Sequence, residues 1–344
     1  MKVLVIKRDK IGDLLLATPL LAQLKAGLPR VETHLLANDY NAWVVAGNPH
    51  LDRVWVYRRV RHAGRVSLGA AWQGLWQGLA LRRERYDWVI VANGDESPRA
   101  IRRGLAVRGA RTVARCADRS KYPGLTDPLP PDSASHEIER LLAFLSPLGI
   151  PIPEKGKTPF PRYVLPAASA AFALSWLAER GLAPGSYVVL GLGARRPKKQ
   201  PSTAQVLAWS AQLKQRWGLA TVFMWTPGKP DDPRYPGDDD VAQPVLDAAS
   251  HGHAPRIHPF RGPIAEALGL IWSARTSIFP DSGLMHFAAA SPGGVLGLFA
   301  EADVSPAPAQ WAPRGPRADW LEAERSVSEL PEALVYERLA KLLA

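Results

Sequence analysis

Short apolar runs alternate with longer segments of helical pattern through the first half of the chain. The run at residues 2–7 (KVLVIK) is typical of a buried strand, and residues 13–24 follow it with the spacing of a helix. Further short apolar runs lie at residues 34–37, 53–57 and 87–92. Strands that alternate with helices indicate βαβ units and therefore a parallel sheet.

The same alternation begins again after residues 151–166, where five prolines interrupt any regular element. It starts with an expected helix at 168–180 and an expected strand at 186–192. We therefore predict an α/β protein of two lobes, residues 1–160 and 161–328, followed by an amphipathic helix in residues 329–344.

The excess of basic charge is confined to the first half. The whole chain has 43 Lys and Arg against 32 Asp and Glu, a formal net charge of +11. Residues 1–165 hold 26 and 15 of these, a net charge of +11, and residues 166–344 hold 17 and 17, a net charge of zero. This asymmetry indicates an anionic partner for the first half: a nucleic acid, an anionic lipid or a phosphorylated acceptor. A basic surface that is merely solvated is the alternative.

Composition argues against several other classes. No apolar run reaches the roughly 18 residues of a membrane span, and the N-terminus lacks the apolar core of a signal peptide. Cys116 has no second cysteine to pair with. His251, His253 and His258 lie in a loop-like segment without the spacing of a ligand pair, so we expect no metal ion. A cytoplasmic protein is the default expectation.

Gly12 and Asp13 lie between the first expected strand and the first expected helix. Gly12 allows a tight turn, and Asp13 falls at the helix start, where a carboxylate can cap free N–H groups. The functional alternative is that Asp13 is a general base, which a transferase with a hydroxyl nucleophile needs as the new bond forms. The local pattern leaves both interpretations open.

A second strand–turn–helix pattern covers residues 279–286 (FPDSGLMH). A Ser-Gly turn that opens a helix presents unpaired backbone N–H groups, which suit a diphosphate. Asp281 is placed to hold sugar or ribose hydroxyls, and His286 lies one turn into the helix. An ordinary helix cap is again the alternative.

A third candidate is the glycine-rich strand end at residues 191–193, which is followed by Arg195, Arg196, Lys198 and Lys199. Four basic residues beside Gly193 favour an anion site, because this half has no net charge of its own. A solvated basic loop is the alternative.

In this order and at these distances, the segments resemble the heptosyltransferases of glycosyltransferase family 9. The resemblance extends over nearly the whole chain. It is carried by residues 11–20 (IGDLLLATPL), 86–90 (YDWVI), 136–140 (HEIER), the Gly193-Ala194 loop and residues 281–286 (DSGLMH). The first and last of these motifs are the specific ones.

The resemblance implies a GT-B fold, in which two Rossmann-like lobes with parallel sheets face a central cleft. It implies an inverting transfer without metal or other cofactor, from ADP-heptose or a related nucleotide sugar to the inner core of lipopolysaccharide. The basic first lobe would bind this anionic glycolipid acceptor at the inner membrane surface, and the second lobe the donor. The final helix would cross back onto the first lobe. A monomer that binds no nucleic acid is expected, with peripheral attachment to the inner membrane as an open alternative.

By the same resemblance, Asp13 is the catalytic base. The donor would be bound by Asp281 at its sugar, by the backbone of Ser282, Gly283 and Leu284 at its diphosphate, and by Gly193 and His286. Lys198 or Lys199 would neutralise the diphosphate, with Lys198 favoured by the position of the following proline. Gly12, Arg58, Arg59 and Arg61 would contact the acceptor.

The chain departs from the family pattern at three places. Gln200 replaces a tryptophan after the lysines, and residues 300–303 (AEAD) replace Gly-Pro-Thr. In the loop at residues 227–240, Asp238, Asp239 and Asp240 all compete for the donor ribose.

Three other functions stay open from the sequence. They are a nucleotide-sugar epimerase of the same fold, a family member that binds without transfer, and a nucleic-acid-binding protein. The last lacks a recognition helix or zinc signature. Trp72 and Trp76, at helical spacing near the arginines, either pack in a core or touch lipid or acceptor sugar.

Overall fold

The computed structural model describes residues 1–58, 61–62, 65–66, 68–154, 156–193, 196–229, 231–232, 237–251, 256–301 and 307–344. For residues 61, 62, 65, 66, 68, 70 and 71 it describes the backbone alone. The chain divides into two compact units, Met1–Val164 and Leu165–Ala344. The division falls inside the proline-rich segment at residues 151–166.

The first unit is built on a six-stranded sheet with the order β3-β2-β1-β6-β7-β8, in which all neighbouring strands are parallel. The central strands are buried along nearly their whole length, which explains their continuous apolar sequences. Its strands are β1 (Lys2–Ile6), β2 (Glu32–Asn38), β3 (Arg53–Tyr57), β6 (Trp88–Val91), β7 (Arg111–Arg115) and β8 (Asp127–Leu129).

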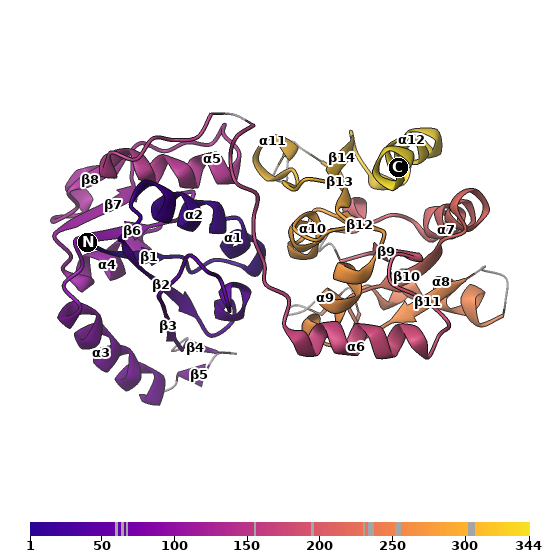
Figure 1. Cartoon of the computed structure of the whole chain (residues 1–344), viewed down its shortest axis with the longest axis horizontal. Coiled ribbons are helices and arrows are strands. Elements are labelled where there is room, and N and C mark those ends of the chain that lie inside the picture. The colour runs from indigo at the N-terminus through magenta and orange to yellow at the C-terminus, as the bar shows by residue number, and fades with distance from the viewer. Residues whose placement is uncertain are drawn as a thin grey trace. The chain divides into compact units, whose positions relative to one another are not determined.

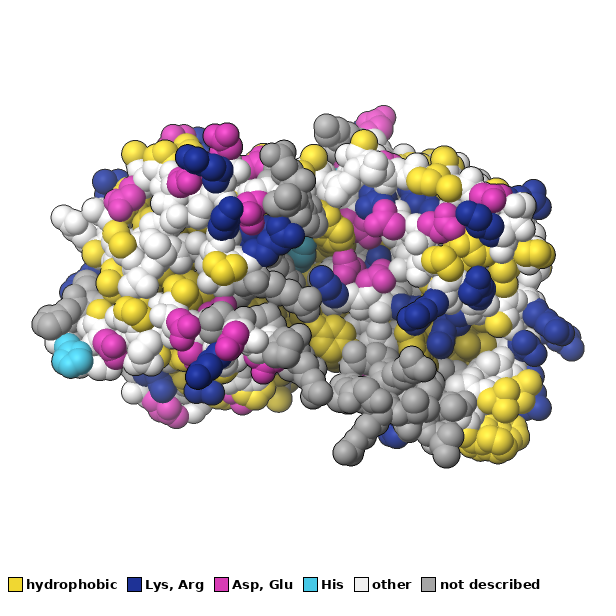
Figure 2. Space-filling view, turned by 180° about the vertical axis from the view of Figure 1, so that it is seen from behind, with side chains coloured by type: hydrophobic (Ala, Val, Ile, Leu, Met, Phe, Trp, Pro, Cys, Tyr) yellow, Lys and Arg dark blue, Asp and Glu magenta, His cyan; other side chains and the backbone are white. Residues whose placement is uncertain are grey.

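Helices cover the two faces of this sheet (Figure 1). Helix α2 packs against α5, and α3 packs against α4. On the outer side of α3 a group of hydrophobic side chains lies at the surface (Figure 2). The helices are α1 (Ile11–Leu15), α2 (Thr18–Gly27), α3 (Leu68–Arg83), α4 (Pro98–Val107) and α5 (Glu137–Leu142), and a short antiparallel pair, β4 (Arg61–His62) and β5 (Arg65–Val66), precedes α3.

The helix expected at residues 13–24 is in fact two helices, α1 and α2. Pro19 lies in the first turn of α2, where the missing N–H of a proline removes no helical hydrogen bond. Strands β7 and β8 were not predicted from the sequence, because RTVAR and DPL lack the apolar run that marks the other strands.

The second unit repeats the architecture. Its sheet has the order β11-β10-β9-β12-β13-β14, again with parallel neighbours throughout. The strands are β9 (Tyr187–Gly191), β10 (Ala220–Met224), β11 (Ile257–Phe260), β12 (Thr276–Pro280), β13 (Val295–Ala300) and β14 (Ala318–Ala323). The helices are α6 (Ala167–Ala178), α7 (Thr203–Trp217), α8 (Asp239–Ser250), α9 (Ile264–Ser273), α10 (Gly283–Ala289), α11 (Pro308–Trp311) and α12 (Glu332–Leu343).

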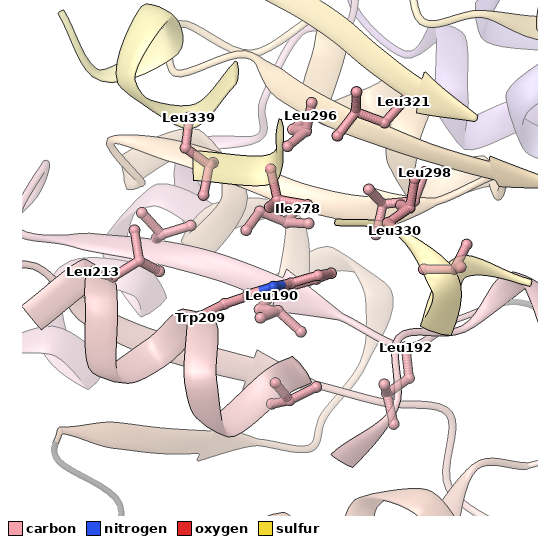
Figure 3. Packing of buried hydrophobic residues seen from close by; sticks show 14 of the residues in the cluster. Leu190, Leu192, Trp209, Leu213, Ile278, Leu296, Leu298, Leu321, Leu330 and Leu339 are labelled. Carbon is pink, nitrogen blue, oxygen red and sulfur yellow. The ribbon is translucent and has the colours of Figure 1, made fainter. Parts of the chain in front are cut away.

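The final helix, α12, packs on the second unit, so the expectation that it crosses back onto the first lobe was wrong. Its Leu339 is fully buried in one core cluster with Leu296 of β13 and Leu321 of β14, as Figure 3 shows. Arg275 also donates a hydrogen bond to the carbonyl oxygen of Leu343 at 2.7 Å and so holds the C-terminal end of the helix. The apolar side of α12 thus covers the last two strands of its own sheet.

We expect Leu339→Ala to lower the free energy of unfolding of the second unit by about 2–5 kcal/mol, because it removes a buried side chain and leaves a cavity. Denaturant unfolding followed by circular dichroism measures this change. The matched control is Leu174→Ala, at a leucine that is 55% exposed, which should change stability by well under about 1 kcal/mol. Equal effects of the two substitutions would contradict the placement of α12 in this core.

Candidate functional site

Each sheet reverses its strand order at one position, between β1 and β6 in the first unit and between β9 and β12 in the second. Both orders are those of a doubly wound sheet, in which the crevice beyond the carboxyl ends of the strands at this switch point binds ligands. The segments singled out from the sequence follow β1, β9 and β12, so they lie beside these two switch points.

At the first switch point, Lys7 is a buried cation held by carboxylates. Its Nζ lies 3.1 Å from Oε1 of Glu137 and 3.1 Å from Oδ2 of Asp9. Although burial opposes it, the charges of these carboxylates and of Asp13 raise the pKa of Lys7 well above its usual value. Lys7 therefore keeps its positive charge inside the unit.

Residues from α5 and from the loop after β6 complete this network. Nη1 of Arg140 lies 3.3 Å from Oε2 of Glu137, and the same guanidinium donates to the carbonyl oxygen of Gly94 at 2.5 Å and to the carboxylate of Asp95. Asn93 donates its amide N–H to Asp9 at 2.8 Å. Glu137 and Arg140 belong to the family motif at residues 136–140, but the motif alone indicates no role for either. The sequence did offer one indication of such a role: a lysine at the buried end of a strand, Lys7, needs an acidic partner elsewhere in the chain.

Asp13 lies at the edge of this network. Its Oδ2 accepts a hydrogen bond from the backbone N–H of Lys10 at 2.9 Å, so the capping interpretation of the sequence describes a real contact. Burial raises the pKa of Asp13, and the charge of Asp9 adds to this increase while Lys7 opposes it. A carboxylate with a raised pKa beyond the end of a central strand is suited to accept a proton.

Arginines gather around Tyr57, the last residue of β3. Arg8 donates from Nε to the hydroxyl of Tyr57 at 2.7 Å, and the guanidinium of Arg103 lies 4.1 Å from the centre of the Tyr57 ring. Arg58 follows and is exposed. Of the other predicted acceptor contacts, Arg59 and the side chain of Arg61 lie outside the described residues. Gly12 is buried within α1.

At the second switch point, a lysine from the loop after β9 meets the aspartate after β12. Nζ of Lys199 lies 2.5 Å from Oδ2 of Asp281, and the Lys199 side chain is 6% exposed. Lys198 has a side chain that is 63% exposed and lies 3.3 Å from Glu301, the residue after β13. The fold thus brings Lys199 to Asp281, although the motif had favoured Lys198.

Two buried polar atoms beside Asp281 have no hydrogen-bond partner within the described parts of the chain. They are Oγ of Ser282 and Nδ1 of His286. Burial lowers the pKa of His286 to about 4, so its imidazole is neutral near pH 7. Because buried polar atoms are nearly always paired, this pair marks a place where a ligand or a water molecule completes the structure.

Two of the three departures from the family pattern have local explanations, whereas Ala302 and Asp303 of the third lie outside the described residues. Gln200 donates from Nε2 to Oδ1 of Asp238 at 2.5 Å, so it closes the loop that follows β10. Asp239 accepts from the indole N–H of Trp225 at 2.8 Å and from the backbone N–H of Gly228 at 2.9 Å. Asp240, in contrast, is exposed. The carboxylates of Asp238 and Asp239, two of the three candidate ribose ligands, therefore form hydrogen bonds that stabilise the loop after β10.

One group with metal-ligand chemistry occurs among the described residues: Glu32, His34 and Glu84, whose ligand atoms lie within 4.8 Å of one another. It lies at the amino ends of the strands, away from the switch point. Nζ of Lys2 lies 2.6 Å from Glu84 and 3.4 Å from Glu32, so an ammonium ion already balances the two carboxylates. We interpret it as a surface ion-pair cluster.

Two doubly wound sheets of the same order in one chain, each with polar groups at its switch point, are the architecture of the GT-B fold. The model of glycosyltransferase family 9 (heptosyltransferase) matches residues 75–329, which is most of the chain. The chain therefore belongs to this family. The motif with Asp13 precedes the matched residues.

Solved structures with the same fold cover the whole chain. A family 9 glycosyl transferase from Veillonella parvula has a TM-score of 0.77 at 17% identity and covers 99% of this chain and 97% of its own. ADP-heptose LPS heptosyltransferase II of E. coli has a TM-score of 0.74 at 18% identity, with 100% and 98% covered. E. coli heptosyltransferase WaaC with ADP has a TM-score of 0.75 at 17% identity, with 99% and 100% covered. No curated protein matches the chain by sequence.

Among the described helices, not one combines the length and the apolar character that a membrane crossing requires.

The neutral, buried His286 predicts a loss of stability in acid. The unfolded chain takes up a proton on this imidazole near pH 6.5 and the folded chain only near pH 4, so between these values the unfolded state binds more protons. The free energy of unfolding should therefore fall as the pH decreases through this interval, by on the order of 3 kcal/mol from this group. Denaturant unfolding at several pH values should show a shallower decrease for His286→Gln than for wild type. If the exposed His251→Gln variant lost as much of the pH dependence, the assignment to His286 would be incorrect.

Proposed function

We propose that this glycosyltransferase transfers a heptose, or a closely related sugar, from an ADP-activated donor to the anionic inner core of lipopolysaccharide. The observation that carries the proposal is that the two switch points present different functional groups. The first has Asp13, a carboxylate with a raised pKa beside a basic surface, and the second has Lys199 and unpartnered polar atoms. The family match and the ADP in a similar solved structure support this choice.

In the proposed reaction, an acceptor hydroxyl oxygen attacks the anomeric carbon of the donor sugar. Asp13 takes the proton of that hydroxyl as the new bond forms, and the bond to the nucleoside diphosphate breaks with its electron pair on the leaving phosphate oxygen. Attack from the opposite side inverts the anomeric centre. Lys7 remains charged and paired to Glu137, and it limits how far burial can raise the pKa of Asp13.

On the donor side, we propose that Asp281 contacts the sugar and that the backbone N–H groups of residues 282–284 bind the diphosphate. Ser282 and His286, each with an unpartnered buried atom, supply further contacts to the donor. Lys199 neutralises the leaving diphosphate, which fits its position beside Asp281. Lys198 is exposed and is paired with Glu301.

On the acceptor side, we propose that phosphate groups of the glycolipid bind the arginines at the end of β3. Arg8 and Arg103 join Arg58 here because all three flank or follow Tyr57. A guanidinium is suited to this task since its planar donors match phosphate oxygens. An epimerase of the same fold would have no use for such a surface, because it binds no acceptor.

Asp13→Asn should lower kcat by about 10²- to 10⁴-fold, because the amide cannot accept the hydroxyl proton. Release of ADP from ADP-heptose in the presence of a deep-rough lipopolysaccharide acceptor measures turnover, and calorimetry with ADP should show unchanged donor-side binding. Wild-type kcat should fall on the acid side at a higher pH than an ordinary aspartate would dictate, since protonated Asp13 is inactive. Asp87→Asn, at the amino end of the same sheet, is the control. Full turnover in the Asp13 variant would remove the general-base assignment.

Lys199→Gln should weaken ADP binding by about tenfold, whereas Lys198→Gln should change it by less than about threefold, because Lys198 is exposed and paired with Glu301. Calorimetric titration of both variants with ADP makes the comparison, and thermal unfolding checks that each is folded. A larger loss in Lys198→Gln would assign the diphosphate to Lys198, as the motif alone had favoured.

A further inference from the structure

Helix α3 exposes large apolar side chains on the surface of the first unit. Its residues 68–81 (LGAAWQGLWQGLAL) contain no charged side chain. Trp72 is 64% exposed, Leu75 59%, Trp76 53% and Leu79 37%. All four belong to α3, where Figure 2 shows a group of hydrophobic side chains at the surface. The core alternative for Trp72 and Trp76 is therefore wrong.

The exposed residues form one continuous stripe. Spacings of three, one and three along a helix place residues 72, 75, 76 and 79 on a single side. The rings of Trp72 and Trp76 contact each other edge to face, with centroids 6.0 Å apart. The opposite side of the helix carries Leu81, which is buried in a core cluster with Tyr57 and Val89. The side of α3 with Leu81 thus packs against the rest of the unit, and the side with the two tryptophans, which is also apolar, is exposed to solvent.

The charges around the stripe define what covers it. Of the arginines that flank or end α3 in the sequence, the structure describes the side chains of Arg58, Arg82, Arg83 and Arg85. The one acidic residue of this stretch, Glu84, pairs with Lys2 and Arg53. Arg82 and Arg83, which end the helix, are both exposed. A second copy of the chain on this stripe would bring two groups of arginines together, at an electrostatic cost. Tryptophan and leucine flanked by arginine match instead the interface of an anionic bilayer, where indole rings lie at headgroup depth.

We propose that α3 docks the first unit on an anionic phospholipid membrane, with Trp72, Leu75 and Trp76 among the headgroups and the flanking arginines on lipid phosphates. The reason inferred for this docking rests on the proposed function, because a glycolipid acceptor lies in such a membrane. The docking itself requires no catalysis. It holds the arginines at the end of β3 near the membrane surface, since α3 packs against β3.

Flotation with vesicles tests the docking directly. We expect the wild-type protein to float with vesicles of equal parts phosphatidylcholine and phosphatidylglycerol, and to float much less with phosphatidylcholine alone or at high salt. Trp72→Ser/Trp76→Ser should reduce the bound fraction by about tenfold. Leu75→Ser should reduce it as well, whereas Leu174→Ser, at an equally exposed leucine of α6 in the second unit, should not.

Several results would overturn the proposal: no binding of wild-type protein to anionic vesicles, equal binding by the double variant, or equal losses in Leu75→Ser and Leu174→Ser. A measurement of the oligomeric state by light scattering gives one more result that would overturn it. A dimer that dissociates in the double variant would assign the stripe to a second copy.

An activity assay separates this inference from the proposed function. The double variant should transfer sugar to a de-acylated, water-soluble acceptor at the wild-type rate, and lose rate on the same acceptor embedded in anionic vesicles. If the wild-type protein binds vesicles but transfers no sugar to either acceptor, the proposed function fails and the docking stands. If transfer to both acceptors survives the double variant unchanged, the docking has no part in the reaction, and the purpose inferred for it is wrong even where flotation supports the docking itself.

Discussion

The buried ammonium ion of Lys7 constrains much of the first unit. An unpaired charge at the end of a central strand would be very unfavourable, so acidic partners must reach it. Glu137, from α5, lies 130 positions further along the chain and provides one of them at 3.1 Å. Arg140 then pairs with Glu137 and donates to Gly94, in the loop after β6. A Cβ atom at Gly94 would collide with the Glu137 carboxylate, which explains a glycine there. One buried charge therefore ties β1, β6 and α5 together beside Asp13.

The second unit has the same strand order but a different kind of switch point. Its ion pair, Lys199 with Asp281, is less extensive, and Ser282 and His286 keep buried atoms that the described residues leave without partners. Among the described residues both switch points keep buried polar atoms without a partner, on Asn93 and Arg140 in the first and on Ser282 and His286 in the second. The two differ in the group that they present: the first has Asp13, a carboxylate with a raised pKa, and the second has Lys199, a lysine paired with Asp281. This contrast is the physical basis for assigning the proton acceptor to one unit and the nucleotide-sugar donor to the other.

Much of the fold could be predicted because local patterns carry it. The strand expected at residues 53–57 coincides with β3, and the segments of Asp13 and Asp281 both follow strands, as the alternation indicated. Strands β7 and β8 escaped prediction because their apolar content is low, and the break between α1 and α2 was missed although Pro19 marks it. For Trp72 and Trp76 the helical spacing was evident, but whether that side of α3 is covered depends on its neighbours.

By itself, the sequence determined the α/β class, the two units, the family resemblance and the basic character of the first half, because periodicity, composition and short motifs are local properties. Only the tertiary structure decided which side chains meet. An amphipathic α12 has to pack on something, but its pattern does not say that β13 and β14 are the partners. Likewise Lys198 and Lys199 are neighbours with the same chemistry, and the turn after β9 sends one to Asp281 and the other to Glu301. Contacts between residues far apart in the chain depend on the whole sheet being assembled, and no local pattern encodes them.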